Sequence, residues 1–319
     1  NLVFFVAEAF SPYVIDPELT PTLYRMATEG IQFKEYYQPA WGASTTTGEF
    51  SNLIGLVPTK GGSSMNETYQ QKLFLTMGNQ LQKLGYHSTA YHNHLKDFYH
   101  RNNTHPQLGY DEFIARYGGL EITGSWPESD LEMMDFTVPL YIDKQPFHVY
   151  YMTVSGHCRY NFLGNAMSKQ NQALVENYPG SNTIKAYMAC QLELEFALES
   201  LVRQLEEAGI ADDTVIVLST DHYPYGLEPG ATWNNDKDYV AELYGYDPKN
   251  HAQRDHNALI LWSGCLEDKN IVVEEPVYSL DILPTLSNLF GLEYDSRLLV
   301  GRDVFSDAEA IALWYDYTW

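Results

Sequence analysis

Three strongly apolar runs of the sequence end beside residues that can hold a metal ion. The runs and the residues that follow them are LVFFVA (2–7) with Glu8, HVYYMTV (148–154) with Ser-Gly-His157, and TVIVLST (214–220) with Asp221-His222. In open parallel sheets, ligands bind beyond the carboxyl ends of the strands. If these runs are parallel neighbours, the side chains meet at one edge, where carboxylate and imidazole groups suit Mn²⁺, Mg²⁺ or Zn²⁺.

Amphipathic segments alternate with the apolar runs along the chain. The patterns predict helices over 20–30, 67–84, 183–208 and 279–292, and further strands over 87–92 and 257–263. Thr20 and Ser279 are the expected N-caps of the first and last of these helices. This alternation predicts an α/β fold with a mostly parallel central sheet covered by helices on both faces.

Composition and length narrow the domain organisation and the partners. We expect an α/β catalytic core over 1–250 and a smaller C-terminal subdomain over 251–319, with the polar stretch 223–256 near the site. A net charge of -23 argues against nucleic acid as a partner. No apolar run approaches the roughly 20 residues of a membrane span, and the three cysteines allow at most one disulfide.

The segment WGASTTTGEF (41–50) offers a nucleophile for such a metal site. Its threonines precede a helix-like stretch, and the N-terminus of a helix favours negative charge. A threonine alkoxide becomes accessible near neutral pH when a metal ion lowers the pKa of the hydroxyl. A threonine beside a carboxylate-bound metal is therefore chemically coherent.

Together these motifs identify a family. With VAEAF around Glu8, the Asp221-His222-Tyr223 motif and the segment YHNHLKDFYHRNNTHPQLGYDEF (91–113), the chain resembles the extracellular catalytic domain of lipoteichoic acid synthases and related phosphoglycerol transferases, in the alkaline phosphatase/sulfatase superfamily. The resemblance covers nearly the whole chain. It implies an alkaline phosphatase-like fold and a metal site made by Glu8, Thr45, Asp221 and His222. The family's spacing to Glu49-Phe50 selects Thr45, rather than Thr46 or Thr47, as the nucleophile.

The resemblance also implies the substrate side of the site. His92 and Arg101 match residues that contact the phosphate or glycerol, Tyr99 matches an aromatic wall, and His157 matches a substrate-side histidine that we expect to be catalytic. Three departures from the family pattern are Ala9 for a serine, Tyr99 for a tryptophan, and DHYPYG (221–226) for DHYG. No cysteine opens the motif that formylglycine sulfatases require, so the chain is not expected to be such a sulfatase.

The implied activity is a metal-dependent transfer of glycerophosphate from a phospholipid such as phosphatidylglycerol to a hydroxyl of a polymer or glycolipid, through a threonine-linked intermediate. One divalent cation is expected, with Mn²⁺ the first choice. The implied location is the extracellular face of a bacterial membrane, with N-terminal transmembrane helices that precede this sequence. The alternatives are a phosphodiesterase or phosphatase on the same scaffold, a phosphoethanolamine transferase, and a non-catalytic binding domain.

Overall fold

The three apolar runs form neighbouring strands of one sheet. They are β7 (Phe147–Met152), β1 (Leu2–Ala7) and β8 (Val215–Thr220), with β1 in the middle. Both pairings are parallel, so the carboxyl ends of the three strands share one edge, as predicted. The computed structural model describes residues 1–42, 45–59, 64–231, 237–316 and 318–319.

The central sheet is mostly parallel, which confirms the predicted fold class. Within the described residues it has nine strands, in the order β11-β2-β10-β8-β1-β7-β4-β5-β6. Only β10 runs antiparallel to its neighbours β2 and β8. The further strands of this sheet are β2 (Ile31–Phe33), β4 (His87–Leu95), β5 (Glu112–Arg116), β6 (Gly119–Leu120), β10 (Ile260–Trp262) and β11 (Val272–Val273).

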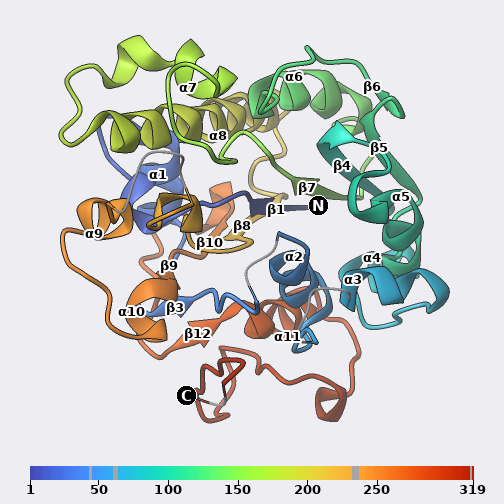
Figure 1. The fold of residues 1–319 in the computed structure, drawn as a ribbon. Helices are drawn as coiled ribbons and strands as arrows, with labels where there is room; N and C mark the ends of the chain where they lie inside the picture. The colour runs from blue at the N-terminus through green and yellow to red at the C-terminus, as the bar shows by residue number, and fades with distance from the viewer. Residues whose placement is uncertain (43–44, 60–63, 232–236, 317) are drawn as a thin grey trace.

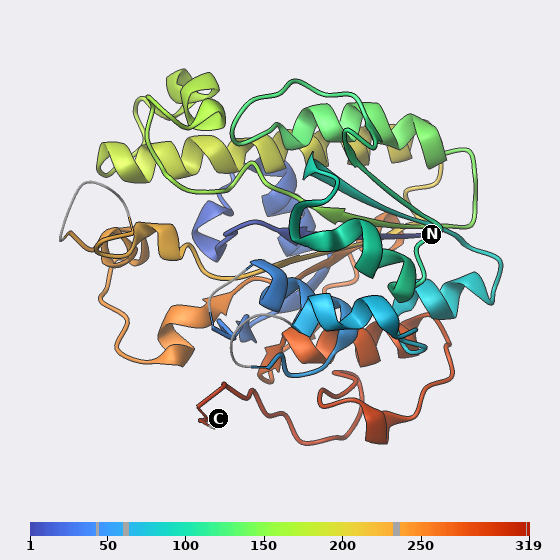
Figure 2. The same ribbon diagram turned by 45° about the vertical axis from the view of Figure 1, so that its right-hand side comes forward.

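Helices cover both faces of the sheet, as Figures 1 and 2 show. Side chains alternate along β1, so Val3 and Phe5 join one core, and Leu2 and Phe4 join the other. The first core is closed by α1 (Pro21–Glu29), α6 (Asp130–Tyr141) and α8 (Asn182–Glu207), with α7 (Ala166–Gln170) packed on α8. The second core is closed by α2 (Thr45–Ile54), α4 (Met77–Gln82) and α11 (Ile282–Leu289).

The helices predicted over 20–30 and 183–208 are α1 and α8. Thr20 is the N-cap residue of α1, as predicted, but its side chain makes no capping hydrogen bond. The hydroxyl of Thr20 donates to Val14 O at 2.6 Å instead. The Glu195 carboxylate on α8 caps the helix instead, because Thr22 N and Leu23 N donate to its two oxygens. The cap comes from 172 residues away in sequence, so local pattern could not reveal it.

The helix predicted over 67–84 is wrong. The chain forms α3 (Ser64–Glu67), a 3₁₀ turn over Thr68–Gln70, and then α4 after a non-helical stretch. The hydroxyl of Thr76 and the amide of Asn79 both donate to Leu73 O, at 2.8 and 2.9 Å. Such side chains compete with the backbone for hydrogen bonds and interrupt a helix.

The helix predicted over 279–292 is shorter and begins differently. A 3₁₀ turn over Ser279–Asp281 precedes α11, and the hydroxyl of Ser279 makes no hydrogen bond within the described part of the chain. The Asp281 carboxylate accepts from Tyr278 N at 3.1 Å instead. The expected N-cap at Ser279 is therefore wrong, because the N-cap position of this turn is Tyr278, and Asp281 accepts from the backbone N–H of Tyr278.

The C-terminal third of the chain contributes to two sheets. The strand predicted over 257–263 shortens to β10 in the central sheet, while β9 (His256–Asn257) pairs with β3 (Tyr36–Tyr37), which also pairs with β12 (Val277–Tyr278). The stretch 223–256 holds α9 (Tyr239–Tyr244) and α10 (His251–Asp255), and residues 232–236 lie outside the described residues. The division at residue 250 remains a prediction, and β10 beyond it belongs to the central sheet.

Neither a membrane span nor a disulfide is found in the part of the chain that the structure describes. None of the described helices combines the length and apolar character needed to cross a bilayer. Cys158, Cys190 and Cys265 are all free thiols.

The remaining short helix is α5 (Arg101–Thr104), which lies beside β4. Its first residue, Arg101, is a candidate site residue.

His148 on β7 should make the fold sensitive to acid. Burial lowers the pKa of this imidazole to about 3, whereas an unfolded histidine titrates near 6.5. The unfolded chain therefore binds the proton first, and stability is lost as the pH falls from about 6.5 toward 3. Lowering the pH from 7.5 to 5 should cost about 2 kcal/mol of unfolding free energy through this residue.

Urea unfolding of His148→Phe at both pH values measures this contribution. The variant should lose about 2 kcal/mol less than the wild type over the same pH step. His87→Phe, at an exposed position on β4, is the matched control and should keep the wild-type pH dependence. Equal losses in His148→Phe and the wild type would show that His148 is not the group responsible.

Candidate active site

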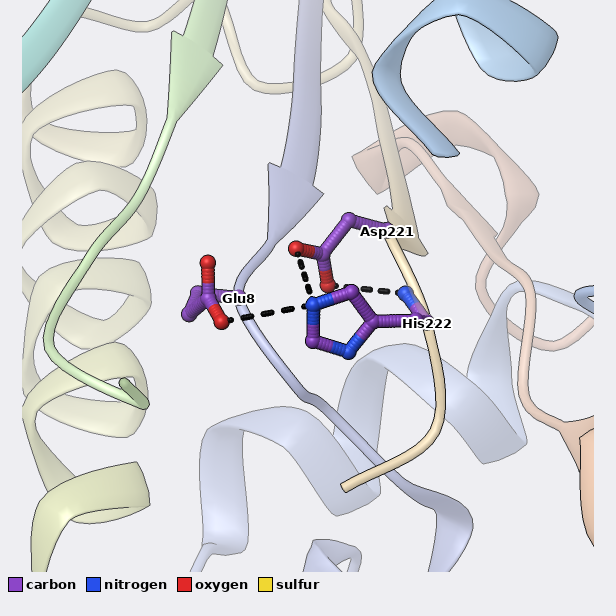
Figure 3. Close-up of side chains that lie close together, drawn as sticks. All are labelled: Glu8, Asp221 and His222. Atoms are coloured by element: carbon purple, nitrogen blue, oxygen red, sulfur yellow. Dashed lines mark hydrogen bonds and ion pairs between the residues drawn. The ribbon is translucent and has the colours of Figure 1, made fainter. Parts of the chain in front are cut away.

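Glu8, Asp221 and His222 meet at the shared strand edge and form what we call the strand-end cluster (Figure 3). Glu8 follows β1, and the other two follow β8 directly. His222 Nε2 lies 3.0 Å from Asp221 Oδ2 and 3.5 Å from Glu8 Oε1. All three residues are buried. Glu8, Asp221 and His222 therefore lie together, as predicted from their positions at the strand ends.

The cluster fits a divalent cation. His222 Nδ1 contacts Tyr223 O at 2.9 Å, which leaves Nε2 facing the two carboxylates. Asp221 Oδ1 accepts from Ala9 N and His222 N, whereas Asp221 Oδ2 and His222 Nε2 are buried, face each other at 3.0 Å without hydrogen-bond geometry, and have no other hydrogen-bond partner among the described residues. Buried polar atoms of this kind usually have a partner. Two carboxylates and one imidazole are a donor set used for Mn²⁺ and Zn²⁺.

The charges of the cluster are strongly coupled. Burial, and then the neighbouring Asp221 carboxylate, raise the pKa of Glu8 well above its usual range. Burial alone would raise the pKa of Asp221, but the charge of His222 outweighs it and lowers that pKa. For His222, burial is outweighed by Asp221, and the pKa rises to about 9. The two carboxylates therefore favour positive charge between them.

Addition of Mn²⁺ should stabilise the protein through this cluster. A ligand that binds only the folded state at a hundred times its Kd adds about 2.7 kcal/mol. Asp221→Asn should remove most of this gain, measured as the Mn²⁺-induced shift of Tm. Asp213→Asn, at an exposed position two residues before β8 begins, should keep the full shift. An undiminished shift in Asp221→Asn would place the cation elsewhere.

Thr45 is the first residue of α2 and reaches the cluster. Its Oγ1 donates to Glu8 Oε2 at 3.1 Å, and only 8% of the residue is exposed. The structure thus brings together the four residues predicted to bind metal. The preceding residues 43 and 44 lie outside the described residues.

Gly48 explains how α2 comes so close to the strand-end cluster. A Cβ atom on Gly48 would lie 1.8 Å from Asp221 O, a distance that no side chain could occupy. Asn52, one turn later, donates from its amide to Thr220 O at 3.0 Å. The helix bearing Thr45 therefore rests directly on the backbone at the end of β8.

Arg101 lies in a buried ionic network with Glu49. Arg101 Nε donates to both oxygens of Glu49 at 3.1 and 3.0 Å, and Tyr150 and His105 also contact this carboxylate. Burial alone would raise the pKa of Glu49, but Arg101 outweighs it and holds that pKa well below its usual range. Arg101 Nη2 is buried and has no hydrogen-bond partner among the described residues. It could therefore donate to an anion.

His92 and Tyr99 both contact Arg101. Arg101 Nη1 lies 3.2 Å from His92 Nε2, while His92 Nδ1 lies 2.8 Å from Met152 O. Both ring nitrogens of His92 are therefore occupied, so a phosphate contact by His92 remains a prediction that requires a rearrangement. The ring of Tyr99 lies 5.3 Å from the Arg101 guanidinium and is 39% exposed. This position is consistent with the predicted aromatic wall.

His157 lies at the same sheet edge, but it makes no hydrogen bond to the strand-end cluster within the described residues. Its Nδ1 lies 2.6 Å from Cys158 O, and its ring packs 4.8 Å from that of Trp126. Burial would lower the pKa of His157, but Cys158 outweighs it and raises that pKa. The catalytic role of His157 therefore remains a prediction.

Two site residues escaped the sequence analysis. The ring of Tyr225 packs against His222 with centroids 4.2 Å apart, and the Glu49 carboxylate holds Arg101. The departure DHYPYG marked the loop of Tyr225 as unusual, which was a usable signal. Glu49 appeared only as a spacing marker, and its partner lies 52 positions away.

The family model described as Sulfatase matches residues 1–292. The chain belongs to the sulfatase family. Its curated relatives include lipoteichoic acid synthase of Staphylococcus saprophyticus, 26% identical over 96% of this chain and 47% of that protein. Lipoteichoic acid synthase 1 of Bacillus subtilis is 24% identical over 96% of this chain and 48% of that protein. The chain thus spans about half the length of these relatives.

Solved structures of this sulfatase-family fold agree with the architecture. The lipoteichoic acid synthase LtaP of Listeria monocytogenes superposes with a TM-score of 0.74 at 20% identity, over 95% of this chain and 75% of that one. The phosphoglycerol transferase GacH of Streptococcus pyogenes, in complex with sn-glycerol-1-phosphate, gives a TM-score of 0.61 at 15% identity, over 93% of this chain and 76% of that one. At these identities the likeness establishes the alkaline phosphatase-like fold.

Proposed function

We propose that this sulfatase-family domain transfers glycerophosphate from a phospholipid such as phosphatidylglycerol to a hydroxyl of a polymer or glycolipid. The observation that carries the proposal is the hydrogen bond from Thr45 Oγ1 to Glu8 Oε2, which holds a nucleophile against the strand-end cluster. The names of the relatives, lipoteichoic acid synthases and a phosphoglycerol transferase, support the substrate class.

Glu8, Thr45, Asp221 and His222 would hold one divalent cation, with Mn²⁺ as the first choice. The cation would supply Lewis-acid polarisation and lower the pKa of a hydroxyl group. The cluster's own geometry supports this assignment, since two buried carboxylates and His222 Nε2 face one another there. The metal site would thus favour ionisation of the nucleophile.

In the first step, Thr45 Oγ1 forms a bond to phosphorus, and the bond from phosphorus to the diacylglycerol oxygen breaks. The Thr45 proton is directed at Glu8 Oε2, and His157 is the proposed source of the proton that the departing oxygen gains. In the second step, the acceptor oxygen bonds to phosphorus, the bond to Thr45 breaks, and the proton held at Glu8 returns to the Thr45 oxygen, which restores the threonine hydroxyl. His157 then takes the acceptor's proton.

Arg101 would stabilise the phosphate charge during both steps. Its buried Nη2, which has no hydrogen-bond partner in the described part of the chain, can donate to a phosphate oxygen, and Glu49 holds the guanidinium in place. Tyr99 would pack against the headgroup, and His92 would orient Arg101 or contact the phosphate after a small rearrangement. Positioned charge of this kind carries much of the catalysis at phosphorus.

The proposed setting is the extracellular face of a bacterial membrane, close to the lipid donor, with membrane helices that belong to the longer protein. This location rests on the relatives, of which the chain spans about half.

Intact-mass measurement after incubation with phosphatidylglycerol and Mn²⁺ tests the function. A glycerophosphoryl adduct on the peptide that contains Thr45 is the expected result. Omission of Mn²⁺ should abolish the adduct, and phosphatidylethanolamine should give far less of it. Product analysis with and without a glycerol acceptor then separates transfer from hydrolysis. Free glycerophosphate as the sole product in both reactions would identify a phosphodiesterase instead.

A further inference from the structure

A five-residue segment that leads into α6 contacts the ends of both β4 and β7. The segment is WPESD (126–130), and we call it the brace segment. The ring of Trp126 packs against that of His157, with centroids 4.8 Å apart. The fully buried carboxylate of Glu128 lies 2.9 Å from His94 Nδ1 on β4. The proposed transfer steps give none of the brace residues a role.

The carboxylate of Asp130, the last residue of the brace segment, joins the two strand ends. Its Oδ1 accepts from Asn93 Nδ2 on β4 at 2.6 Å. The same oxygen accepts from Val154 N and Ser155 N, which follow β7, both at 3.2 Å. Its Oδ2 accepts from the hydroxyl of Ser155. Asp130 is 1% exposed, and its three partner residues are buried as well, so water does not compete for these hydrogen bonds.

On β4, the contact with Asp130 lies next to the phosphate side of the site. β4 and β7 are last paired at His92 and Met152, so Asp130 binds the two chains just beyond the end of their pairing. His92 directly precedes Asn93, and its Nε2 lies 3.2 Å from Arg101 Nη1. The hydrogen bond to Asn93 therefore fixes the strand end from which His92 meets Arg101.

Beyond β7, the same carboxylate fixes the turn that leads to His157. Val154 N donates to Asp130, and Val154 O accepts from His157 N at 2.9 Å. His157 O in turn accepts from Asn165 Nδ2 at 3.0 Å. The backbone of His157 is thus held at both its N–H and its carbonyl, and Val154 connects it directly to Asp130.

The brace segment is itself anchored to the rest of the fold. Ser129 caps α6, because its Oγ accepts from Glu132 N at 3.0 Å, and it also donates to Glu193 Oε2 on α8. α6 packs against α8 and β4 (Figure 1). Asp130 is the first residue of α6, where the helix dipole favours a negative charge. The carboxylate therefore has a fixed position from which it can hold both strand ends.

We propose that Asp130 is a positioning residue, which aligns the phosphate side of the site with His157. It touches no substrate, and it acts through Asn93 on β4 and through Ser155 after β7. A displacement of about 1 Å between catalytic groups can cost on the order of a hundredfold in rate. This inference rests on the proposed function, because it concerns how the residues of that reaction are held. The alternative is a purely structural role, in which the carboxylate only stabilises the fold.

The first test compares diacylglycerol release from phosphatidylglycerol, in the presence of Mn²⁺, in three variants. Asp130→Asn places an NH₂ group where hydrogen-bond donors already point, and it should lower the rate about tenfold at pH 7.5. Ser155→Ala removes one of the four hydrogen bonds to this carboxylate and should lower the rate about threefold. Asp135→Asn is the matched control and should keep the wild-type rate. Asp135 lies on the same helix and also accepts from a serine, Ser200 on α8, at 2.6 Å.

The pH dependence of the rates tests whether the ionised carboxylate is responsible. Burial raises the pKa of Asp130 to about 6, although the hydrogen bonds that it accepts lower it. Below this pH the wild-type carboxyl is protonated and resembles the amide of Asp130→Asn. The wild-type rate divided by the variant rate should therefore fall from about ten at pH 7.5 toward one near pH 5. Ionisable groups on the elements around Asp130 include His92 and His94 on β4, His157 after β7, Cys190 and Glu193 on α8, and Glu128 and Glu132 beside it in the chain. All of these are present in both proteins, so their own titration cancels in the ratio.

The ring signal of His157 tests the positioning without turnover. It is measured by ¹H–¹³C NMR at pH 7.5 with Mg²⁺ in place of the paramagnetic Mn²⁺, and it is assigned with His157→Gln. The signal should shift in Asp130→Asn and in Ser155→Ala, and it should stay in place in Asp135→Asn. Urea unfolding of each variant reports whether the fold is retained under these conditions.

The outcomes separate the inference from its alternative and from the proposed function. A wild-type rate in Asp130→Asn, a rate ratio that does not change between pH 7.5 and pH 5, or an unshifted His157 signal would overturn the positioning role. If Asp130→Asn does not fold, Ser155→Ala decides, because a wild-type rate and an unshifted signal there would overturn it equally. Absence of diacylglycerol release in the wild type would refute the proposed function alone, and the His157 signal would still decide the role of Asp130.

Discussion

Thr45→Ala should lower the rate of headgroup transfer by at least about 10⁴-fold, as the loss of a nucleophile does in other covalent enzymes. The hydroxyl that donates to Glu8 at 3.1 Å would be missing, so no phosphoryl bond to the protein could form. Diacylglycerol release from phosphatidylglycerol in the presence of Mn²⁺ is the measurement. The fold should be retained, because the substitution removes few atoms at the start of a helix.

Thr46→Ala is the matched control for this experiment. It removes a hydroxyl from the neighbouring helical position, which is also buried, and it should leave most of the activity in place. The assignment of Thr45 would be overturned if Thr45→Ala kept near-normal activity, or if Thr46→Ala were the inactive variant. The Mn²⁺-induced shift of Tm in each variant reports whether the metal site survives.

Glu49→Ala should destabilise the protein by about 3–5 kcal/mol, the usual effect of breaking a buried ion pair. The variant leaves the guanidinium of Arg101 fully buried without its carboxylate, and it also removes the acceptor for Tyr150. Urea unfolding at neutral pH measures the loss. The control is Glu112→Ala on the exposed side of β5, which should change the unfolding free energy by less than about 0.5 kcal/mol.

The double variant Glu49→Ala/Arg101→Ala identifies the cause of that loss. If the unpaired charge dominates, removing Arg101 as well should recover part of the stability lost in Glu49→Ala. If the double variant is instead less stable than Glu49→Ala, because removal of the Arg101 side chain leaves a second cavity, then packing rather than charge causes the loss. Activity should be lost in both variants, since each displaces or removes the proposed phosphate contact.

The centre of the site was predictable because it follows from local rules. Glu8 and Asp221 directly follow apolar runs, with His222 next to Asp221, and parallel strands bring their carboxyl ends to one edge. That reasoning placed Glu8, Asp221 and His222 together correctly. The selection of Thr45 over Thr46 and Thr47 needed the family's spacing, because all three threonines share the same local sequence character.

The errors arose where distant or side-chain contacts override local pattern. The cap of α1 comes from Glu195, and the partner of Arg101 is Glu49; neither pairing leaves a periodic trace in the sequence. The helix expected over 67–84 is interrupted because Thr76 and Asn79 bond to Leu73 O. In each case, the residue that makes the deciding hydrogen bond can be identified only from the three-dimensional structure.

The close contact between Gly48 and the Asp221 carbonyl sets the distance between α2, which bears Thr45, and the strand-end cluster. The two backbones touch directly at this point. No side chain lies between them that could change rotamer or shift, so the distance between α2 and the end of β8 is fixed. Because misplacement by about 1 Å can cost on the order of a hundredfold in rate, the absence of a side chain at position 48 would determine how accurately Thr45, the proposed nucleophile, is positioned.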